Sequence, residues 1–260
     1  MTTPLVVVEP HGPATVLRLN RPDKRNALSR ALIAELTAAV SSAALDHECR
    51  VLILTGNGPA FCAGMDLEEL RGTVENSGEA ELVWEDAQRL STLYTLLYEL
   101  PKPTIAAVNG AAVAGGAGLS TVCDLAVAVP TAKFGYPEVR RGLVAAMVLP
   151  HLLRHVNERT ARWLLLTGEL ITADAARRAG LVNAVVEPAE LMNTALTWAM
   201  HCVAGGPKAL ATTKALLRRC GPQSVSVAEL AHASAEPRLT DECNAGLGAF
   251  FGGHAPPWMS

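Results

Sequence analysis

Two glycine-containing loops are the segments of this sequence in which the backbone itself could do chemistry. Residues 63–66 (AGMD) follow the apolar run 51–55, and residues 114–118 (AGGAG) follow the apolar run 104–108. We expect each run to be a buried strand and each loop to lead directly into a helix, so that unpaired N–H groups point outward. Because glycine carries no obstructing side chain, two such amides that converge on one point would form an oxyanion hole.

The same pattern also fits a purely structural interpretation. Strand, glycine loop and helix succeed one another in many α/β proteins, where the loop is only a tight connection. The loops do not form a usual phosphate cradle, because the sequence contains no GxxxxGK[ST] and residues 115–118 do not match G-x-G-x-x-G. We therefore expect no dinucleotide site, and the loops alone leave the oxyanion hole and the tight turn as alternatives.

The remaining pattern predicts an α/β core followed by helices. We expect a hairpin from residues 5–8 and 15–19, a helix capped by Ser29, and a helix over about 87–97. Residues 119–123 suggest a helix and 125–129 a strand. Residues 68–85 are too polar to assign, and within them 71–85 could be a flap over the acyl group or a solvated helix and loop. The further expected helices lie near the C-terminal end, over residues 157–167, 172–179, 188–203 and 207–217.

Composition limits the kind of protein. The chain has 260 residues, of which 50% are hydrophobic and 18% charged, as expected of a compact globular protein. Its net charge of −3 gives no reason to expect nucleic acid as a partner. The six cysteines show no CxxC pairing, so we expect neither a metal site nor disulfides, and a cytoplasmic location. No signal peptide or membrane-spanning run is expected.

Several short motifs occur in an order and spacing that resemble the crotonase (enoyl-CoA hydratase/isomerase) superfamily. The resemblance extends over about residues 5–220. It rests on residues 20–28 (NRPDKRNAL), 60–67 (AFCAGMDL), 102–110 (KPTIAAVNG), 114–116 (AGG), 123–124 (CD), 134–138 (FGYPE), 166–168 (LTG) and 179–182 (AGLV).

The resemblance implies a crotonase (ClpP-like) spiral of β-β-α units over residues 1–200 and a helical oligomerisation region over 201–260, assembled as a homotrimer or dimer of trimers. It implies an acyl-CoA substrate, no separate cofactor, oxyanion amides on Met65 and Gly115, and Glu138 as the catalytic acid/base. The implied substrate-binding residues are Lys24, Arg25, Ala27, Leu28, Ala63, Asp66, Leu67, Gly116, Gly118 and Tyr136.

One position departs from the pattern of the family's hydratases, which place two glutamates across the acyl chain. Glu138 matches the second glutamate, but Gly118 stands at the position of the first. Hydration benefits from two groups, whereas a shift of a double bond needs only one base, so this departure favours isomerisation. Some bacterial branched enoyl-CoA hydratases share the glycine, however, so both reactions stay open. Glu138 could also be a solvated loop carboxylate.

Other residues could replace the missing acid, and other functions stay possible. Tyr136, His151 and Asp124 are candidates, although each could equally be a pocket-lining, capping or structural residue. The C-terminal stretch 250–258 has only His254 as a possible cation, where relatives often carry a basic run that meets a CoA phosphate. The alternatives are a catalytically silent acyl-CoA-binding protein, or decarboxylation or thioester hydrolysis in the same oxyanion hole.

Overall fold

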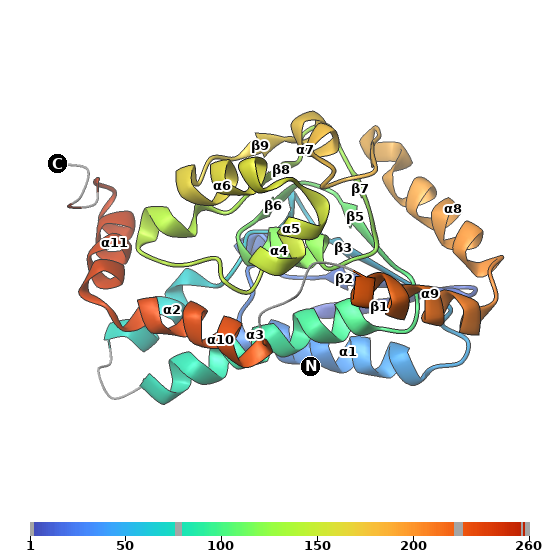
Figure 1. The fold of residues 1–260 in the computed structure, drawn as a ribbon, viewed down its shortest axis with the longest axis horizontal. Coiled ribbons are helices and arrows are strands. Elements are labelled where there is room, and N and C mark those ends of the chain that lie inside the picture. Colours follow the sequence, from blue (N-terminus) through green and yellow to red (C-terminus); the bar gives the residue numbers. More distant parts are fainter. Residues whose placement is uncertain (1–2, 76–79, 221–225, 256, 258–260) are drawn as a thin grey trace.

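The computed structural model describes residues 3–75, 80–220, 226–255 and 257, and it shows an α/β fold built from two sheets surrounded by helices (Figure 1). The first sheet has six strands in the order β1-β2-β3-β5-β7-β10, and the second has four in the order β4-β6-β8-β9. The strands are β1 (Val6–His11), β2 (Ala14–Leu19), β3 (Val51–Gly56), β4 (Ala60–Cys62), β5 (Thr104–Val108), β6 (Ala111–Val113), β7 (Leu125–Ala128), β8 (Lys133–Gly135), β9 (Ile171–Thr172) and β10 (Ala184–Val185).

From β3 to β8, consecutive strands alternate between the two sheets, which produces the expected spiral of β-β-α units. Strands β3, β5 and β7 pair in parallel in the first sheet, while the strands that follow each of them, β4, β6 and β8, pair in parallel in the second. Every residue of β3 and β5 is buried, as is usual for parallel strands covered on both faces. The carboxyl ends of β4 and β6 therefore lie side by side, and both glycine loops begin there.

The helices pack around the sheets (Figure 1). They are α1 (Arg30–Leu45), α2 (Leu67–Glu75), α3 (Ala80–Glu99), α4 (Gly115–Thr121), α5 (Leu149–His155), α6 (Glu158–Thr167), α7 (Ala173–Ala179), α8 (Leu191–Val203), α9 (Pro207–Cys220), α10 (Val227–Ala235) and α11 (Asp241–Gly252), with 3₁₀ turns η1 (Pro22–Lys24), η2 (Pro137–Arg141), η3 (Pro188–Glu190) and η4 (Glu236–Leu239). Among the described residues, no helix is both long and apolar enough to cross a membrane.

Most elements agree with the sequence-based expectation. The hairpin is β1–β2, and the Ser29 side chain accepts a hydrogen bond from the Leu32 N–H at the start of α1. One boundary was wrong: the helix expected to begin at Leu119 begins at Gly115. Helix propensity argues against glycine, but burial of the whole of α4 against its neighbours outweighs it. The unassigned stretch 68–85 contains most of α2 and the start of α3, with residues 76–79 outside the described part.

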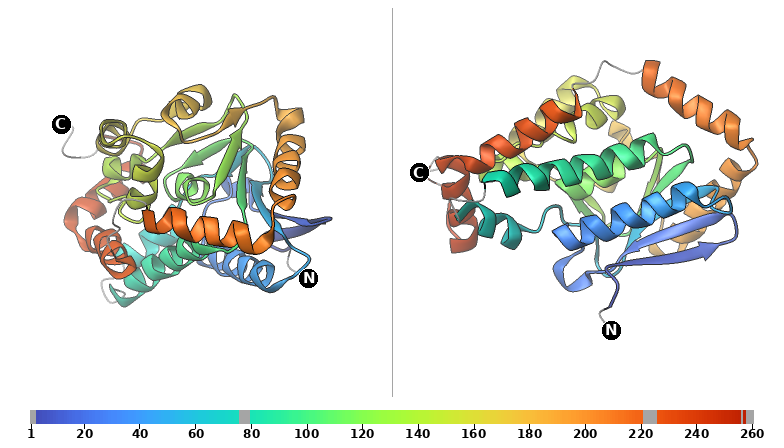
Figure 2. Two further views of the ribbon diagram at one scale, coloured as in Figure 1. Left: turned by 45° about the vertical axis from the view of Figure 1, so that its right-hand side comes forward. Right: turned by 90° about the horizontal axis from the view of Figure 1, so that it is seen from below.

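The C-terminal helices close the open side of the spiral. Helix α10 lies along α3, with Ala231 and Ala235 packed against Val83 and Ala87 (Figure 2). Helix α11 packs against α2 and η2, where Cys243 and Leu247 meet Leu70. As a result, residues from the end of the chain cover the region between α3 and η2.

Candidate active site

The two glycine loops lie against each other. Gly64 has a φ of +92°, and a Cβ built on it would lie 2.9 Å from the Val113 carbonyl oxygen and 3.3 Å from the Gly115 nitrogen. A Cβ on Gly116 would overlap the Cys62 carbonyl. Only glycine therefore allows the two backbones to approach this closely.

The amides of Met65 and Gly115 are both available to a ligand. In the part of the chain that the structure describes, neither N–H donates to an acceptor, although Gly64 and Asp66 on either side of Met65 exchange backbone hydrogen bonds with Leu28. Gly115 is the first residue of α4, so its N–H has no partner within the helix. Both residues line the same cavity. This arrangement has the form of an oxyanion hole.

Ala114, immediately before the Gly115 amide, has a strained backbone. It is the N-cap of α4 with φ 53° and ψ −126°, a conformation that a residue with a side chain rarely adopts. Its own N–H donates to the Gly135 carbonyl at 2.8 Å, which ties the strained residue to β8. Sequence reasoning did not identify this residue, because nothing in the residue type signals the conformation.

A largely apolar cavity lies in front of these amides. It encloses about 750 Å³, including open solvent at its mouth. Its residues come from both glycine loops, α3, η2, the segment after η2 and the C-terminal helices. They are Ala63, Met65, Leu67, Leu70, Leu90, Tyr94, Val113, Ala114, Gly115, Pro137, Glu138, Arg141, Leu143, Val144, Ala145, Ala146, Met147, Val148, Ser234 and Arg238.

Glu138 is the carboxylate of this cavity. It lies in η2, and its Oε2 atom is buried without a hydrogen-bond partner among the described residues. Burial raises the pKa of Glu138 from 4.5 to about 7, although a backbone N–H and the Arg141 guanidinium oppose this shift. A carboxyl group with this pKa can both accept and return a proton near neutral pH. Its position excludes the alternative of a solvated loop carboxylate.

Tyr94 occupies the space that a side chain at position 118 would need. A Cβ on Gly118 would lie 2.7 Å from Tyr94 Cζ and 2.6 Å from Val148 Cγ1, and it would overlap the Tyr94 hydroxyl. That hydroxyl donates a hydrogen bond to the Gly115 carbonyl at 2.6 Å. Burial raises the pKa of Tyr94 well above 10, and Cys62 and Glu138 add to this effect, so the phenol stays protonated.

Sequence reasoning missed Tyr94 as a site residue. The sequence shows it only as one of the apolar positions on the helix before residue 100, with no motif around it. The buried face of α3 brings Tyr94 and Leu90 to the cavity. The one available signal was the glycine at position 118, which implies that another group fills the vacated volume.

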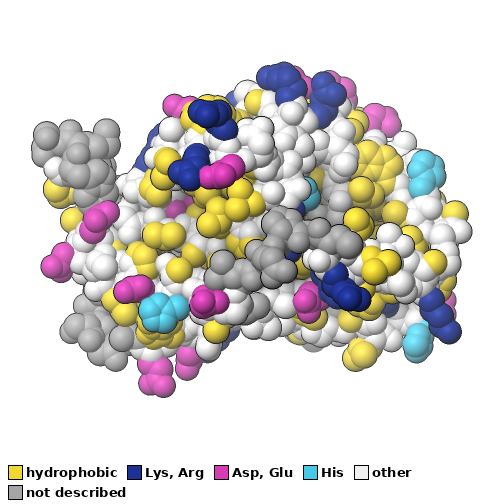
Figure 3. Space-filling model, in the orientation of Figure 1, with side chains coloured by type: hydrophobic (Ala, Val, Ile, Leu, Met, Phe, Trp, Pro, Cys, Tyr) yellow, Lys and Arg dark blue, Asp and Glu magenta, His cyan; other side chains and the backbone are white. Residues whose placement is uncertain are grey.

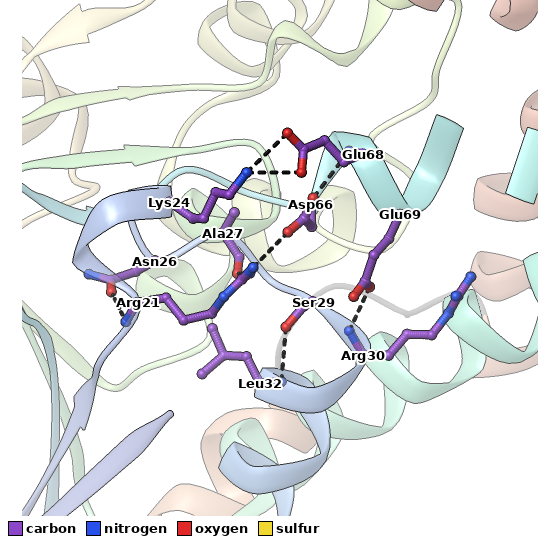
Figure 4. A network of polar contacts seen from close by, with 10 residues as sticks. All are labelled: Arg21, Lys24, Asn26, Ala27, Ser29, Arg30, Leu32, Asp66, Glu68 and Glu69. Carbon is purple, nitrogen blue, oxygen red and sulfur yellow. Dashed lines mark hydrogen bonds and ion pairs between the residues drawn. The ribbon is translucent and has the colours of Figure 1, made fainter. Parts of the chain in front are cut away.

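The expected CoA-binding residues form a polar network beside the cavity (Figure 4). The Lys24 ammonium pairs with the Glu68 carboxylate of α2 at 2.9 Å. Arg21 pairs with the buried Asp66 carboxylate at 3.0 Å and donates to the Ala27 carbonyl at 2.6 Å. Arg25 is exposed and has a φ of 50°. This network fixes the loop that carries Ala27 and Leu28 against the loop that carries Met65.

The structure places the remaining expected residues as follows. Glu138, Met65, Gly115, Ala63 and Leu67 meet in the cavity. Four other expected residues are buried but do not line the cavity: Gly116, Gly118, Asp66 and Leu28. Tyr136 is in the core, where its hydroxyl is 2.9 Å from Thr121 Oγ1.

The proposed substitutes for the missing acid lie outside the lining. Asp124 accepts from Thr104 N at 2.7 Å and pairs with Lys214, which is a structural role. His151 packs edge-on against Tyr98, and burial lowers its pKa to about 4. His254 is exposed at the end of α11, while Pro256 and Trp258 lie outside the described residues. No group of three or more potential ligands among the described residues could hold a metal ion.

Comparison with known proteins agrees with this geometry. Residues 12–259 match the model of the enoyl-CoA hydratase/isomerase family. The chain is 37% identical to the short-chain-enoyl-CoA hydratase of Clostridium acetobutylicum over 82% of this chain and 81% of that protein. It is 36% identical to the 2,3-dehydroadipyl-CoA hydratase of Escherichia coli over 93% of each.

Solved structures give the same result. The crystal structure of an enoyl-CoA hydratase from Mycobacterium avium superposes with a TM-score of 0.84 at 32% identity, covering 99% of this chain and all of that one. The match extends over both sheets and the C-terminal helices. The chain therefore belongs to the enoyl-CoA hydratase/isomerase family of the crotonase superfamily, and it is an enzyme.

The overlap between position 118 and Tyr94 predicts a measurable coupling. Gly118→Ala should lower the free energy of unfolding by about 2–4 kcal/mol, because the new methyl group displaces the Tyr94 ring and Val148. In a Tyr94→Leu background the same substitution should cost much less. Chemical denaturation of the unsubstituted protein, the two single variants and the double variant measures the free energies of unfolding. Gly248→Ala, where a Cβ has nothing within 4 Å, is the control, and additive effects of the two substitutions would contradict the packing described here.

Proposed function

We propose that the chain adds water across the 2,3 double bond of an enoyl-CoA thioester, with Glu138 as the general acid/base. Gly118 stands at the position of the first of the two glutamates in the usual hydratase site, and Tyr94 provides the second polar group. The observation that carries this proposal is the position of the Tyr94 hydroxyl, which lies over Gly118, bonded to Gly115, in the cavity that Glu138 lines.

The proposed chemistry begins with the thioester oxygen accepting hydrogen bonds from the Met65 and Gly115 amides. The oxygen of a water molecule forms a bond to C3, while its proton passes to the Glu138 carboxylate. The electron pair of the double bond moves to the thioester oxygen as an enolate, where the two amides stabilise the charge. Glu138 then returns the proton to C2. The net change is addition of one water, and no separate cofactor is needed.

Tyr94 would hold the water for this attack. Its own proton is directed to the Gly115 carbonyl, so the lone pairs of its hydroxyl oxygen are free to accept a hydrogen bond from the water. The water would donate its second hydrogen to Glu138. The raised pKa of Tyr94 supports this role, because a neutral phenol beside Glu138 adds no second negative charge.

Isomerisation is the second candidate. It needs only Glu138 and the oxyanion amides, and the cavity beyond them is lined by apolar residues such as Val113, Met147 and Val148. Conversion of a 3-enoyl-CoA without hydration of a 2-enoyl-CoA would identify the enzyme as an isomerase. Decarboxylation or thioester hydrolysis would show as loss of CO₂ or free CoA, and a silent acyl-CoA-binding protein would give tight binding without turnover.

Binding of the CoA nucleotide and assembly of the chain extend the proposal. We place the CoA phosphates near Lys24 and Arg25, whose side chains are exposed beside the cavity.

Basic and acidic side chains are mixed over the face in Figure 3, where hydrophobic side chains gather over α5 and α6. Trp163 and Leu166 of α6 are 46% and 70% exposed, which supports an apolar contact with another subunit at this helix. We propose a homotrimer or dimer of trimers, with residues 201–260 as the oligomerisation region. We expect the assembly to be cytoplasmic.

The Glu138 assignment predicts a pH profile. Because the carboxylate form accepts the proton, kcat/KM for hydration of crotonyl-CoA should rise as the pH increases through about 7 and level off above it. Glu138→Gln should reduce kcat by about 10²–10⁴-fold above pH 7, where the carboxylate is ionised, and should remove this pH dependence. Steady-state kinetics from pH 5.5 to 9 measures both. The exposed Glu169→Gln is the matched control, and unchanged turnover in Glu138→Gln would refute the assignment.

The Tyr94 assignment predicts a separation of two activities. Tyr94→Phe should lower kcat for hydration by about 10–100-fold, because the water loses its second contact. Exchange of the C2 protons of butyryl-CoA with D₂O should change little, because that step needs only Glu138 and the amides. Tyr98→Phe on the same helix is the control. If Tyr94→Phe loses hydration and exchange equally, the hydroxyl does not position the water, and its role is to hold Gly115 in place through their hydrogen bond.

A further inference from the structure

A buried guanidinium without a carboxylate partner lines the candidate active site. Arg238, in η4, is 5% exposed and contributes to the cavity that contains Glu138. Its Nη2 donates to Ser234 Oγ at 3.3 Å, and its Nη1 is buried with no hydrogen-bond partner among the described residues. Ser234 is itself 4% exposed and lines the same cavity. A buried charge with one long hydrogen bond to a neutral hydroxyl is costly unless an anion completes the site.

Among the residues that the structure describes, no free carboxylate pairs with Arg238. Asp86 is near enough to favour the charged form of Arg238, but its two carboxylate oxygens already bind Arg30 at 2.7 Å and Arg89 at 3.4 Å. Asp86 does not line the cavity, and Glu138, which does, is the proposed acid/base in η2. Arg238 therefore has unsatisfied donors that face the substrate space.

Arg141 adds a second positive charge to the same cavity. Its Nε is buried without a hydrogen-bond partner in the described structure, while Nη1 donates to the Pro137 carbonyl at 3.3 Å. Its guanidinium lies over the Phe250 ring, 4.5 Å from the ring centroid. Two guanidiniums with unused buried donors line a cavity whose other walls are mostly apolar. This is the composition expected of a site for an acyl chain that ends in an anionic group.

From the path of α3 we infer that Arg238 lies at the end of the cavity remote from the Met65 and Gly115 amides. Tyr94 bonds to Gly115 on one turn of α3, and Leu90 lines the cavity one turn earlier. The preceding turn, with Val83 and Ala87, packs against α10, whose last residues lead into Arg238. Ala87 and Val83 precede Tyr94 by two to three helical turns, which correspond to roughly 10–16 Å. An extended acyl group of five or six carbons spans roughly 5–6 Å from its first to its last carbon, and with the long Arg238 side chain it can bridge most of this distance.

We propose that Arg238, assisted by Ser234 and Arg141, binds a carboxylate at the far end of the acyl chain, so that the substrate is the CoA thioester of an unsaturated dicarboxylic acid. This inference rests on the proposed function, because it places the thioester at Met65 and Gly115. The planar guanidinium can accept a carboxylate through two parallel hydrogen bonds.

A phosphate of CoA is the other anion that could reach an arginine. The burial of Arg238 argues against it, because a phosphate keeps more of its hydration than a carboxylate and suits the exposed Lys24 and Arg25 better. The two sources are separable by experiment. A CoA phosphate is present in every acyl-CoA, whereas the terminal carboxylate is present only in some.

Binding of saturated acyl-CoAs tests the proposal without turnover. Calorimetry at pH 7.5 compares adipoyl-CoA with hexanoyl-CoA and glutaryl-CoA with pentanoyl-CoA, pairs that differ only by a carboxylate in place of the terminal methyl. The full-length protein should bind at least one carboxylated ligand about 10–100-fold more tightly than its neutral partner. Arg238→Met should remove this preference and leave the neutral ligands within about threefold, and Arg238→Lys should retain part of it.

Controls keep the result interpretable. The exposed Arg140→Met, beside Arg141 in sequence, should leave the preference unchanged. Equal affinity of the unsubstituted protein for both members of each pair would overturn the proposal. Equal weakening of the binding of all four ligands in Arg238→Met, with its thermal midpoint preserved, would also overturn it and would assign Arg238 to CoA. If Arg238→Met lowers the thermal midpoint, the four ligands are compared in Arg238→Lys instead. Equal weakening of all four ligands in that variant would assign Arg238 to CoA. Failure of hydration with the preference intact would refute the proposed function alone.

Discussion

The close contact between the backbones of two loops determines the geometry of this active site. Gly64 and Gly116 allow residues 63–66 and 114–118 to approach so closely that a Cβ at either glycine would meet the opposite chain. This approach brings the Met65 and Gly115 amides to one cavity with their hydrogens unused. The parallel pairing of β4 with β6 places the loops side by side, and the strained Ala114 turns the second loop into α4. The proposed stabilisation of an enolate depends on this contact.

The same close packing explains how the site differs from a hydratase with two glutamates. Helix α3 places the Tyr94 ring directly over Gly118, so the cavity cannot hold both this tyrosine and a side chain at position 118. The exchange replaces a charged group with a neutral phenol, and Glu138 remains as the carboxylate at the amides. Since Glu138 is largely shielded from water, its pKa of about 7 allows it to carry a proton in either direction. In the proposed mechanism, one carboxylate and one hydroxyl act in place of two carboxylates.

The sequence predicted what depends on local pattern and motif. The two buried strands, the glycine loops, the Ser29 cap and the position of Glu138 follow from residues close together in the chain, and the structure has them. Tyr94 and Arg238 could not be found in this way, because they reach the cavity through the packing of α3 and of η4, far from any motif. The start of α4 at Gly115 was also missed, since tertiary burial overrides the poor helix propensity of glycine. Long-range packing thus supplied the site residues that no local motif indicated.

The central claim is that the two amides hold the thioester oxygen while Tyr94 and position 138 hold the water. A crystal structure of Glu138→Gln with bound crotonyl-CoA tests this most directly, since the slow variant retains its substrate. We predict the thioester oxygen at about 3 Å from both the Met65 and Gly115 nitrogens, and a water between the Tyr94 hydroxyl and the residue 138 side chain, facing C3. A thioester oxygen bound away from these amides, or C3 facing a wall without the Tyr94 hydroxyl, would contradict the account.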